Sequence, residues 1–232
     1  MSGKFTALES NPEMFTSFAR SLGVKSPARF VDVWSFDEET LGCFPQPIVA
    51  VCVLYPSGLD AKRRDVSQVD KGDGSNCLYI KQRLHEVGNA CGTLALMHAI
   101  GNNTSRLEFS HSSPLLEFSA AHHGQNAEHL ADAINRAQFL REASETVASS
   151  GQTETPQVND HVDSHFICFV IGRNGHLVEL DGMKPGPVDH GKLGSEADFF
   201  PQTMRVVREE MVARTEDVNF SVLALTTSLE DD

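Results

Sequence analysis

The sequence has no apolar run near the ~18 residues that a membrane-spanning helix needs. Its first fifteen residues, MSGKFTALESNPEMF, lack the apolar core of a secretory signal. It also contains no internal repeat, no C-x-x-C pair and no H-E-x-x-H motif. We therefore expect a protein of the cytosol or the nucleus, without a metal or an organic cofactor.

Paired cysteines are absent too. The five cysteines, at positions 43, 52, 77, 91 and 168, are odd in number and irregularly spaced. This pattern predicts reduced thiols instead of a disulfide framework. His122, His123 and His129 cluster in the sequence, but no cysteine pair accompanies them. These histidines therefore do not favour a metal site.

Basic residues are scarce relative to acidic ones, with 19 Lys and Arg against 32 Asp and Glu, and the net charge is −13. Nucleic acid and anionic membranes are therefore poor partners, and a basic protein or peptide is a good one. Acidity that serves solubility alone is the alternative interpretation. Nothing indicates a permanent assembly, and we expect a monomer.

The chain has 232 residues, of which 40% are hydrophobic and 22% charged, as is usual for a globular protein. No linker is visible, so we predict one α+β domain over residues 1–232. The stretch 144–163 lacks apolar periodicity and is expected to be a mobile loop. The acidic tail, about 228–232, is expected to fray.

Hydrophobic periodicity places the elements. Helices are expected at residues 12–22, 36–44 and from 91 onward, in much of 108–145, and within 191–210. Buried strands are expected at 48–55, 76–81, 165–171, 176–181 and 220–226, with a short extended piece at 30–34. The stretch Gly172–Gly175 is a strong hairpin signal between two of these strands.

The chain is organised around GNACGTLALMHAI, residues 88–100. The residues after Cys91 are apolar on every face, which predicts a buried helix with Asn89 as its N-cap. A cysteine in the first turn faces the positive end of the helix dipole, which favours the thiolate. A nucleophile and a buried structural cysteine are both compatible with this stretch alone.

The hairpin brings two polar residues together. His165 and Asp181 lie at equal distances from position 173, inside the predicted turn. We therefore expect them on one sheet face, with Cβ atoms ~4.5–5.5 Å apart if directly opposed. A carboxylate beside an imidazole fixes its tautomer and stabilises its protonated form. A structural His–Asp pair at a sheet edge is the alternative.

If this pair faces Cys91, the three residues form a Cys-His-Asp triad, with His165 as base and Asp181 as orienting group. Gln82 precedes the central helix and is the candidate donor to a developing oxyanion, with the Cys91 backbone N–H as a second donor.

Several motifs extend this interpretation to a family. They are NACGT with an upstream KQ, DxHFIxFV, and GHLxELDG followed by KPGP. Further matches are LESNPEMF, FVDV, PQPIVAVCVLYP, the GQTE-x-P loop and FSVLAL. In this order they resemble the small, single-domain members of the ubiquitin carboxyl-terminal hydrolase family of deubiquitinating cysteine proteases, over nearly the whole chain.

The resemblance implies a papain-like α+β fold with a central antiparallel sheet flanked by helices. It implies Cys91 as nucleophile, His165 as general base, Asp181 as orienting acid and Gln82 as oxyanion donor. It also implies ubiquitin as substrate, or a related ubiquitin-like modifier, cleaved from small or flexible adducts because the 144–163 loop crosses the site. Ala7 and Leu8 are the residues it suggests for substrate contact.

One departure separates the chain from the family pattern. About three extra residues, most simply His85-Glu86-Val87, stand between Gln82 and Cys91. If they bulge outward, Gln82 keeps its place. If they shift the backbone register, the Gln82 side chain turns to the other face, which favours a weakly active or inactive ubiquitin-binding protein. A papain-like hydrolase unrelated to ubiquitin is the third hypothesis.

Overall fold

The strands of the protein form a six-stranded antiparallel sheet in the order β1-β6-β2-β3-β4-β5. The structure is a computed structural model that describes residues 4–62, 76–82, 88–122, 125–149, 151, 163–216 and 219–229. The strands are β1 (Arg29–Asp32), β2 (Ile48–Pro56), β3 (Ser164–Ile171), β4 (His176–Leu180), β5 (Val188–Lys192) and β6 (Ser221–Thr226).

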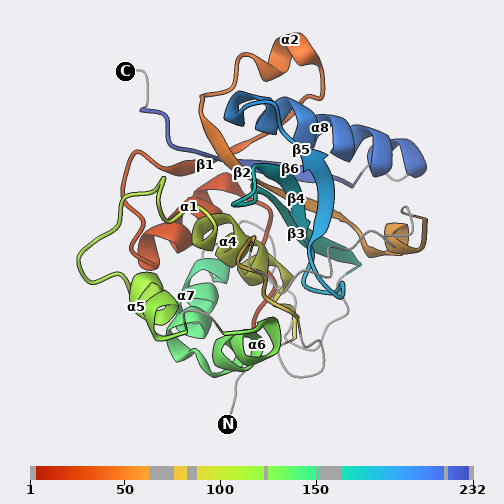
Figure 1. Cartoon of the computed structure of the whole chain (residues 1–232). Helices are drawn as coiled ribbons and strands as arrows, with labels where there is room; N and C mark the ends of the chain where they lie inside the picture. The colour runs from red at the N-terminus through yellow and green to blue at the C-terminus, as the bar shows by residue number, and fades with distance from the viewer. Residues whose placement is uncertain are drawn as a thin grey trace.

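Helices cover both faces of the sheet (Figure 1). The α-helices are α1 (Pro12–Ser21), α2 (Glu38–Leu41), α4 (Cys91–Gly101), α5 (Pro114–Ala121), α6 (Ala127–Arg136), α7 (Gln138–Ala148) and α8 (Phe199–Glu210). The 3-10 turns are η1 (Ser57–Lys62), η2 (Glu196–Asp198) and η3 (Val212–Arg214). Helices α1 and α4 to α7 lie on one face, and α2 and α8 lie on the other.

The central strands explain why the sequence shows no alternation there. In β2, Ala50 and Cys52 belong to the core beneath α4, whereas Val51, Val53 and Tyr55 belong to the core beneath α8. All five are fully buried. A strand covered on both faces gains from apolar side chains at every position, so its sequence is a continuous apolar run.

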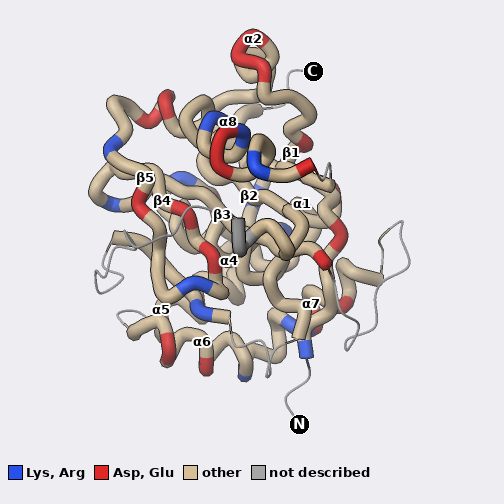
Figure 2. The backbone as a smooth tube through the Cα atoms, turned by 90° about the vertical axis from the view of Figure 1, so that its right-hand side faces the viewer, with Lys and Arg blue, Asp and Glu red and all other residues tan. Residues whose placement is uncertain are grey.

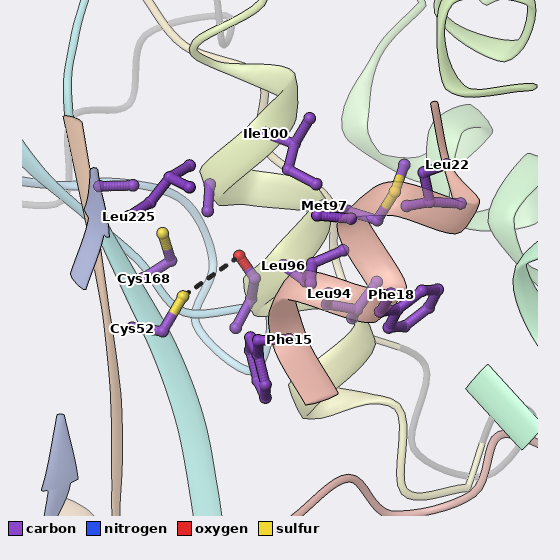
Figure 3. Close-up of a cluster of buried hydrophobic side chains, with 14 of the residues drawn as sticks. Phe15, Phe18, Leu22, Cys52, Leu94, Leu96, Met97, Ile100, Cys168 and Leu225 are labelled. Carbon is purple, nitrogen blue, oxygen red and sulfur yellow. Dashed lines mark hydrogen bonds between the residues drawn. The ribbon is translucent and has the colours of Figure 1, made fainter. Parts of the chain in front are cut away.

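The larger core surrounds α4, whose side chains are buried from Gly92 to Ile100. Figure 3 shows Phe15 and Phe18 of α1 packed toward it and the Cys52 thiol directed at the Ala95 carbonyl oxygen, 3.8 Å away. Cys168 is directly opposite Cys52 in the sheet register. Burial, together with Cys52, raises the pKa of the Cys168 thiol, so both remain structural thiols.

Many of the expected elements are confirmed. Asn11 caps α1 by accepting hydrogen bonds from two backbone amides, with Pro12 at the first helical position and Gly23 just past the end at φ +98°. The strand at 48–55 and the last strand are present. The four residues expected to point inward from α8 are all buried: Phe199, Phe200, Met204 and Val207.

The predicted strand at residues 76–81 is wrong. This segment has no sheet partner and follows an irregular path. Its backbone groups bond elsewhere, because Leu78 N donates to Asn102 Oδ1 at 2.6 Å and Ile80 N donates to His98 Nε2 at 2.9 Å. The side chains of His98 in α4 and of Asn102, the C-cap of α4, therefore replace a neighbouring strand.

Three smaller expectations also change. The helix expected at 36–44 is one turn, Glu38–Leu41, and the sequence analysis missed β5. Asn89 is not the N-cap of α4, since Ala90 occupies that position without a side-chain hydrogen bond. The loop expected at 144–163 begins later, because α7 continues to Ala148.

Parts of that loop lie outside the described residues, as do His85-Glu86-Val87 and the acidic end of the tail. Within the described ranges, no helix is long and apolar enough to cross a membrane. The same part of the chain contains no group of three or more His, Cys, Asp or Glu side chains that could hold a metal ion.

Candidate active site

Cys91 is the first residue of α4, and its side chain is partly exposed. The approach to the helix is a tight turn in which Gly88 has φ +65° and Ala90 N donates to Gly88 O at 2.9 Å. The helix then runs along β3 into the core, as Figure 1 shows. The sequence thus places a thiol at the amino end of a helix, where the dipole stabilises an anion.

His165 and Asp181 meet as the hairpin predicts. His165 Nε2 lies 2.7 Å from Asp181 Oδ1, and both side chains are almost completely buried. The expected register is off by two residues, because Cys168 pairs with Leu180 and the centre of the hairpin is residue 174 instead of 173. Continuing this register places Asp181 opposite Ile167, so Asp181 reaches His165 diagonally on the same face.

Cys91 influences the imidazole as well. Burial by itself lowers the pKa of His165, but Asp181, which holds Nε2, and Cys91 together outweigh it and raise this pKa to about 10. The arrangement therefore favours a protonated His165 ring at neutral pH.

Asp181 lies at the start of a turn that fixes its carboxylate. Met183 N donates to Asp181 Oδ1 at 2.9 Å, and Lys184 N donates to the Asp181 carbonyl oxygen at 3.0 Å. On the other side, the Lys184 ammonium is 4.0 Å from Asp181 Oδ2 and 3.5 Å from Glu179 Oε1. These contacts restrict the carboxylate to the orientation that His165 uses.

Gln82 lies beside this turn. Gln82 N donates to Gly182 O at 2.8 Å, and a Cβ added at Gly182 would come within 3.1 Å of Gln82 Cβ. Among the side chains the structure describes, Gln82 Oε1 is buried without a hydrogen-bond partner. The oxygen of this amide is thus not used by structural bonds of the fold, and the residue stands next to the segment that carries Asp181.

The two candidate substrate contacts differ in exposure. Ala7 is partly exposed, whereas Leu8 is buried. Leu8 packs against the first turn of α4, since a Cβ added at Gly92 would approach Leu8 Cβ to 3.1 Å. The N-terminal segment therefore packs beside Cys91, and Ala7 is the more exposed of the two residues.

Sequence reasoning missed the residues that support Asp181. They are Tyr79, whose hydroxyl contacts the Asp181 turn, and the group formed by the buried Glu179 with the partly buried Lys184 and His190. His190 Nε2 lies 3.1 Å from Glu179 Oε2, and Lys184 lies near Glu179 Oε1. The buried carboxylate of Glu179 therefore has a basic side chain next to each of its oxygens. A charged residue inside the apolar run HLVEL is the one signal that could have pointed to this group.

A half-exposed thiol at a helix start, an imidazole and a carboxylate define the site of a cysteine-type hydrolase. The comparisons agree with this class. A family model described as ubiquitin carboxyl-terminal hydrolase, family 1, matches residues 5–212. The chain belongs to this family, whose members are thiol-dependent ubiquitin hydrolases.

Similar proteins extend over almost the whole chain. Ubiquitin carboxyl-terminal hydrolase isozyme L1 of Rattus norvegicus is 35% identical over 222 residues, which cover 94% of this chain and 96% of the relative. A ubiquitin carboxyl-terminal hydrolase of Aplysia californica is 31% identical over 215 residues, which cover 93% and 98%.

The fold is also similar to a solved structure. The catalytic domain of Trichinella spiralis UCH37, bound to ubiquitin vinyl methyl ester, superposes with a TM-score of 0.74 at 18% identity. The alignment covers 99% of this chain and 97% of that one. The predicted fold class, a papain-like α+β fold with an antiparallel sheet between helices, is confirmed.

Proposed function

We propose that the protein hydrolyses the bond after the C-terminal glycine of ubiquitin, with Cys91, His165 and Asp181 as its catalytic triad. The observation that carries the proposal is the buried His165 ring, which lies 2.7 Å from Asp181 and whose pKa is raised by both Asp181 and Cys91. Membership of the family supports ubiquitin as the substrate.

The reaction follows from this arrangement. The Cys91 thiolate attacks the carbonyl carbon of ubiquitin's C-terminal glycine, and the carbonyl oxygen becomes an oxyanion. The Gln82 amide and the Cys91 backbone N–H donate to that oxygen. When the tetrahedral intermediate collapses, the bond to the leaving amine or thiol breaks, and His165 gives that group its proton. A thioester to Cys91 remains.

Water completes the cycle. The neutral His165 ring accepts a proton from water, and the resulting hydroxide attacks the thioester carbonyl carbon. The carbon–sulfur bond breaks, ubiquitin leaves with a free carboxylate, and the thiolate and imidazolium are restored. Asp181 keeps the ring oriented through both steps and stabilises its charge.

We also propose that the segment after α7 limits the substrates to small or flexible adducts. Its described ends are held at separate places. A Cβ added at Gly151 would approach Glu9 Oε2 to 3.0 Å, and Asp163 O accepts a hydrogen bond from Ser57 N at 3.0 Å. One anchor lies at the N-terminal segment, and the other lies at the end of β2, next to β3.

Release of a fluorophore from a ubiquitin C-terminal amide tests the function. Wild-type protein is expected to turn over the substrate, and Cys91→Ala is expected to lose turnover while it still binds ubiquitin. Cys43→Ala, which removes an exposed thiol, is the matched control and should keep full activity. Equal rates for wild type and Cys91→Ala would refute the nucleophile assignment. Binding without turnover by wild type would instead indicate the inactive ubiquitin-binding protein.

A further inference from the structure

The hydroxyl group of Tyr79 contacts both ends of the turn that carries Asp181. It lies 2.5 Å from the carbonyl oxygen of Lys184 and 3.0 Å from that of Asp181. Tyr79 is buried, with 5% of its surface exposed. A single hydroxyl hydrogen is therefore shared between two carbonyl oxygens of one tight turn, in a place shielded from water.

The ring of Tyr79 is itself fixed. It stacks on His98 of α4, with ring centroids 5.9 Å apart and planes inclined by 8°. His98 is held in turn by the Ile80 amide, which donates to its Nε2 at 2.9 Å. The hydroxyl thus projects from a rigid base formed by the buried helix that begins with Cys91.

The same short segment carries Gln82. Three residues after Tyr79, Gln82 N donates to Gly182 O, inside the turn that the Tyr79 hydroxyl closes. The segment 79–82 and the turn 181–184 are therefore joined at the Tyr79 hydroxyl and at Gln82. Asp181 and Gln82 come from distant parts of the chain. The contacts of Tyr79 with the turn and with His98 of α4 hold both residues in place.

We propose that the Tyr79 hydroxyl is a positioning group for catalysis, which holds the Asp181 carboxylate against His165 and keeps Gln82 in register with it. The role rests on the proposed function, because it matters only if Asp181 orients the catalytic ring. Tyr79 does not touch substrate; it acts through the turn. Small displacements of catalytic groups are enough to reduce rates strongly.

Tyr79→Phe removes the hydroxyl and retains the ring that stacks on His98. Two buried carbonyl oxygens then lose a donor, and the turn can relax away from His165. We expect kcat for ubiquitin amide hydrolysis to fall by about 10–100-fold with little change in KM. We also expect the alkaline limb of the kcat/KM profile to move to lower pH, because a looser Asp181 stabilises the imidazolium less.

Thr203→Val is the matched control. Thr203 is completely buried on α8, on the opposite face of the sheet, and its hydroxyl donates to Phe199 O at 2.7 Å. Its removal should lower the melting temperature without moving the pH limb or changing kcat. Melting curves of both variants confirm that each is folded at the assay temperature.

The outcomes separate the positioning role from the function on which it rests. An active Cys91→Ala enzyme would overturn the triad and the role of Tyr79 together. An inactive Cys91→Ala enzyme, alongside a Tyr79→Phe variant with the wild-type kcat and pH limb, would overturn only the role of Tyr79. Equal losses of kcat in Tyr79→Phe and Thr203→Val would do the same, since they would reflect general destabilisation.

Discussion

The protonation of His165 depends on two opposing influences. Burial of the ring disfavours its charge, whereas Asp181 and Cys91 favour it through hydrogen bonds and negative charge. The second influence is stronger, and the pKa of His165 rises to about 10. An imidazolium that persists at neutral pH is suited to act as a general acid.

Asp181→Asn tests this balance. The amide keeps the shape of the side chain but removes its charge, so the pKa of His165 should fall. We expect kcat/KM to decrease by roughly 10²–10⁴-fold and its alkaline limb to shift to lower pH. The measurement is the pH profile of kcat/KM for ubiquitin amide hydrolysis.

Asp189→Asn provides the control for this prediction. Asp189 also pairs with a histidine, because its Oδ2 lies 2.8 Å from His176 Nδ1, but this pair is partly exposed on β4 and β5. Its removal should leave the pH profile unchanged. A wild-type alkaline limb in Asp181→Asn would show that Asp181 does not set the charge of His165.

His98 makes the fold sensitive to acid. Burial lowers the pKa of His98 from 6.5 to about 4, and the Ile80 amide needs the unprotonated Nε2 as its acceptor. The unfolded chain therefore binds a proton first as pH falls. Stability is present above pH 6.5 and is lost between 6.5 and about 4, by about 3 kcal/mol at 1.36 kcal/mol per pH unit.

His98→Gln keeps an acceptor oxygen but does not titrate. Its free energy of unfolding, measured by urea denaturation, should depend less on pH between 6.5 and 4 than that of the wild type. His111→Gln, at an exposed position, should retain the wild-type slope. An unchanged slope in His98→Gln would mean that other groups cause the acid sensitivity.

At the scale of elements, the end of α1 is joined to the start of α5 by a close contact. Gly23 has φ +98°, and a Cβ there would lie 2.6 Å from Ser113 Cβ. Ser113 caps α5 and also donates from its hydroxyl to Leu22 O at 2.7 Å. The glycine is therefore required both by its backbone conformation and by lack of space.

Gly23→Ala should destabilise the protein more than Gly175→Ala. Gly175 has a similar φ of +77°, but nothing lies within 4 Å of an added Cβ. Gly175→Ala thus reports conformational strain alone, about 1–2 kcal/mol, and Gly23→Ala adds the clash with Ser113. Thermal or urea unfolding measures both; equal losses would show that the α1–α5 contact adjusts without cost.

The elements that could be predicted from sequence are those whose own residues determine them. β2 and β6 are continuous apolar runs because both of their faces are covered, and Asn11, Pro12 and Gly23 set the limits of α1 locally. Segment 76–82 could not be predicted, because its apolar residues resemble a strand while two of its amides bond to side chains of α4 and its C-cap. Such long-range partners leave no local pattern.

The candidate site shows the same division. The proximity of His165 and Asp181 follows from one hairpin, and only its register differs from the expected one, by two residues. The Tyr79 hydroxyl, by contrast, reaches residues more than 100 positions away. No spacing within the sequence indicates that contact, and only the packing of segment 76–82 against α4 creates it.

At the scale of the molecule, the charge is spread over separate elements. Figure 2 shows acidic residues on α2 at one end of the molecule and on α5 and α6 at the other. With a net charge of −13, the protein produces a broad negative field around its surface. A field of this kind attracts a basic protein or peptide, over distances that depend on ionic strength.

We therefore predict that kcat/KM for ubiquitin amide hydrolysis falls several-fold as NaCl is raised from about 0.02 to about 0.3 M, because salt screens the attraction. Alkylation of Cys91 by neutral iodoacetamide is the control and should be nearly independent of salt. If kcat/KM does not change with salt, the acidity serves solubility and not substrate capture.

The position of β6 has a consequence for biosynthesis. This strand, residues 221–226, lies between β1 and β2 and bonds to both. While the ribosome still encloses β6, the nascent polypeptide lacks the strand that joins β1 to β2. Newly made molecules should therefore acquire protease resistance abruptly, only once this strand has emerged, and shorter translation intermediates should depend on chaperones.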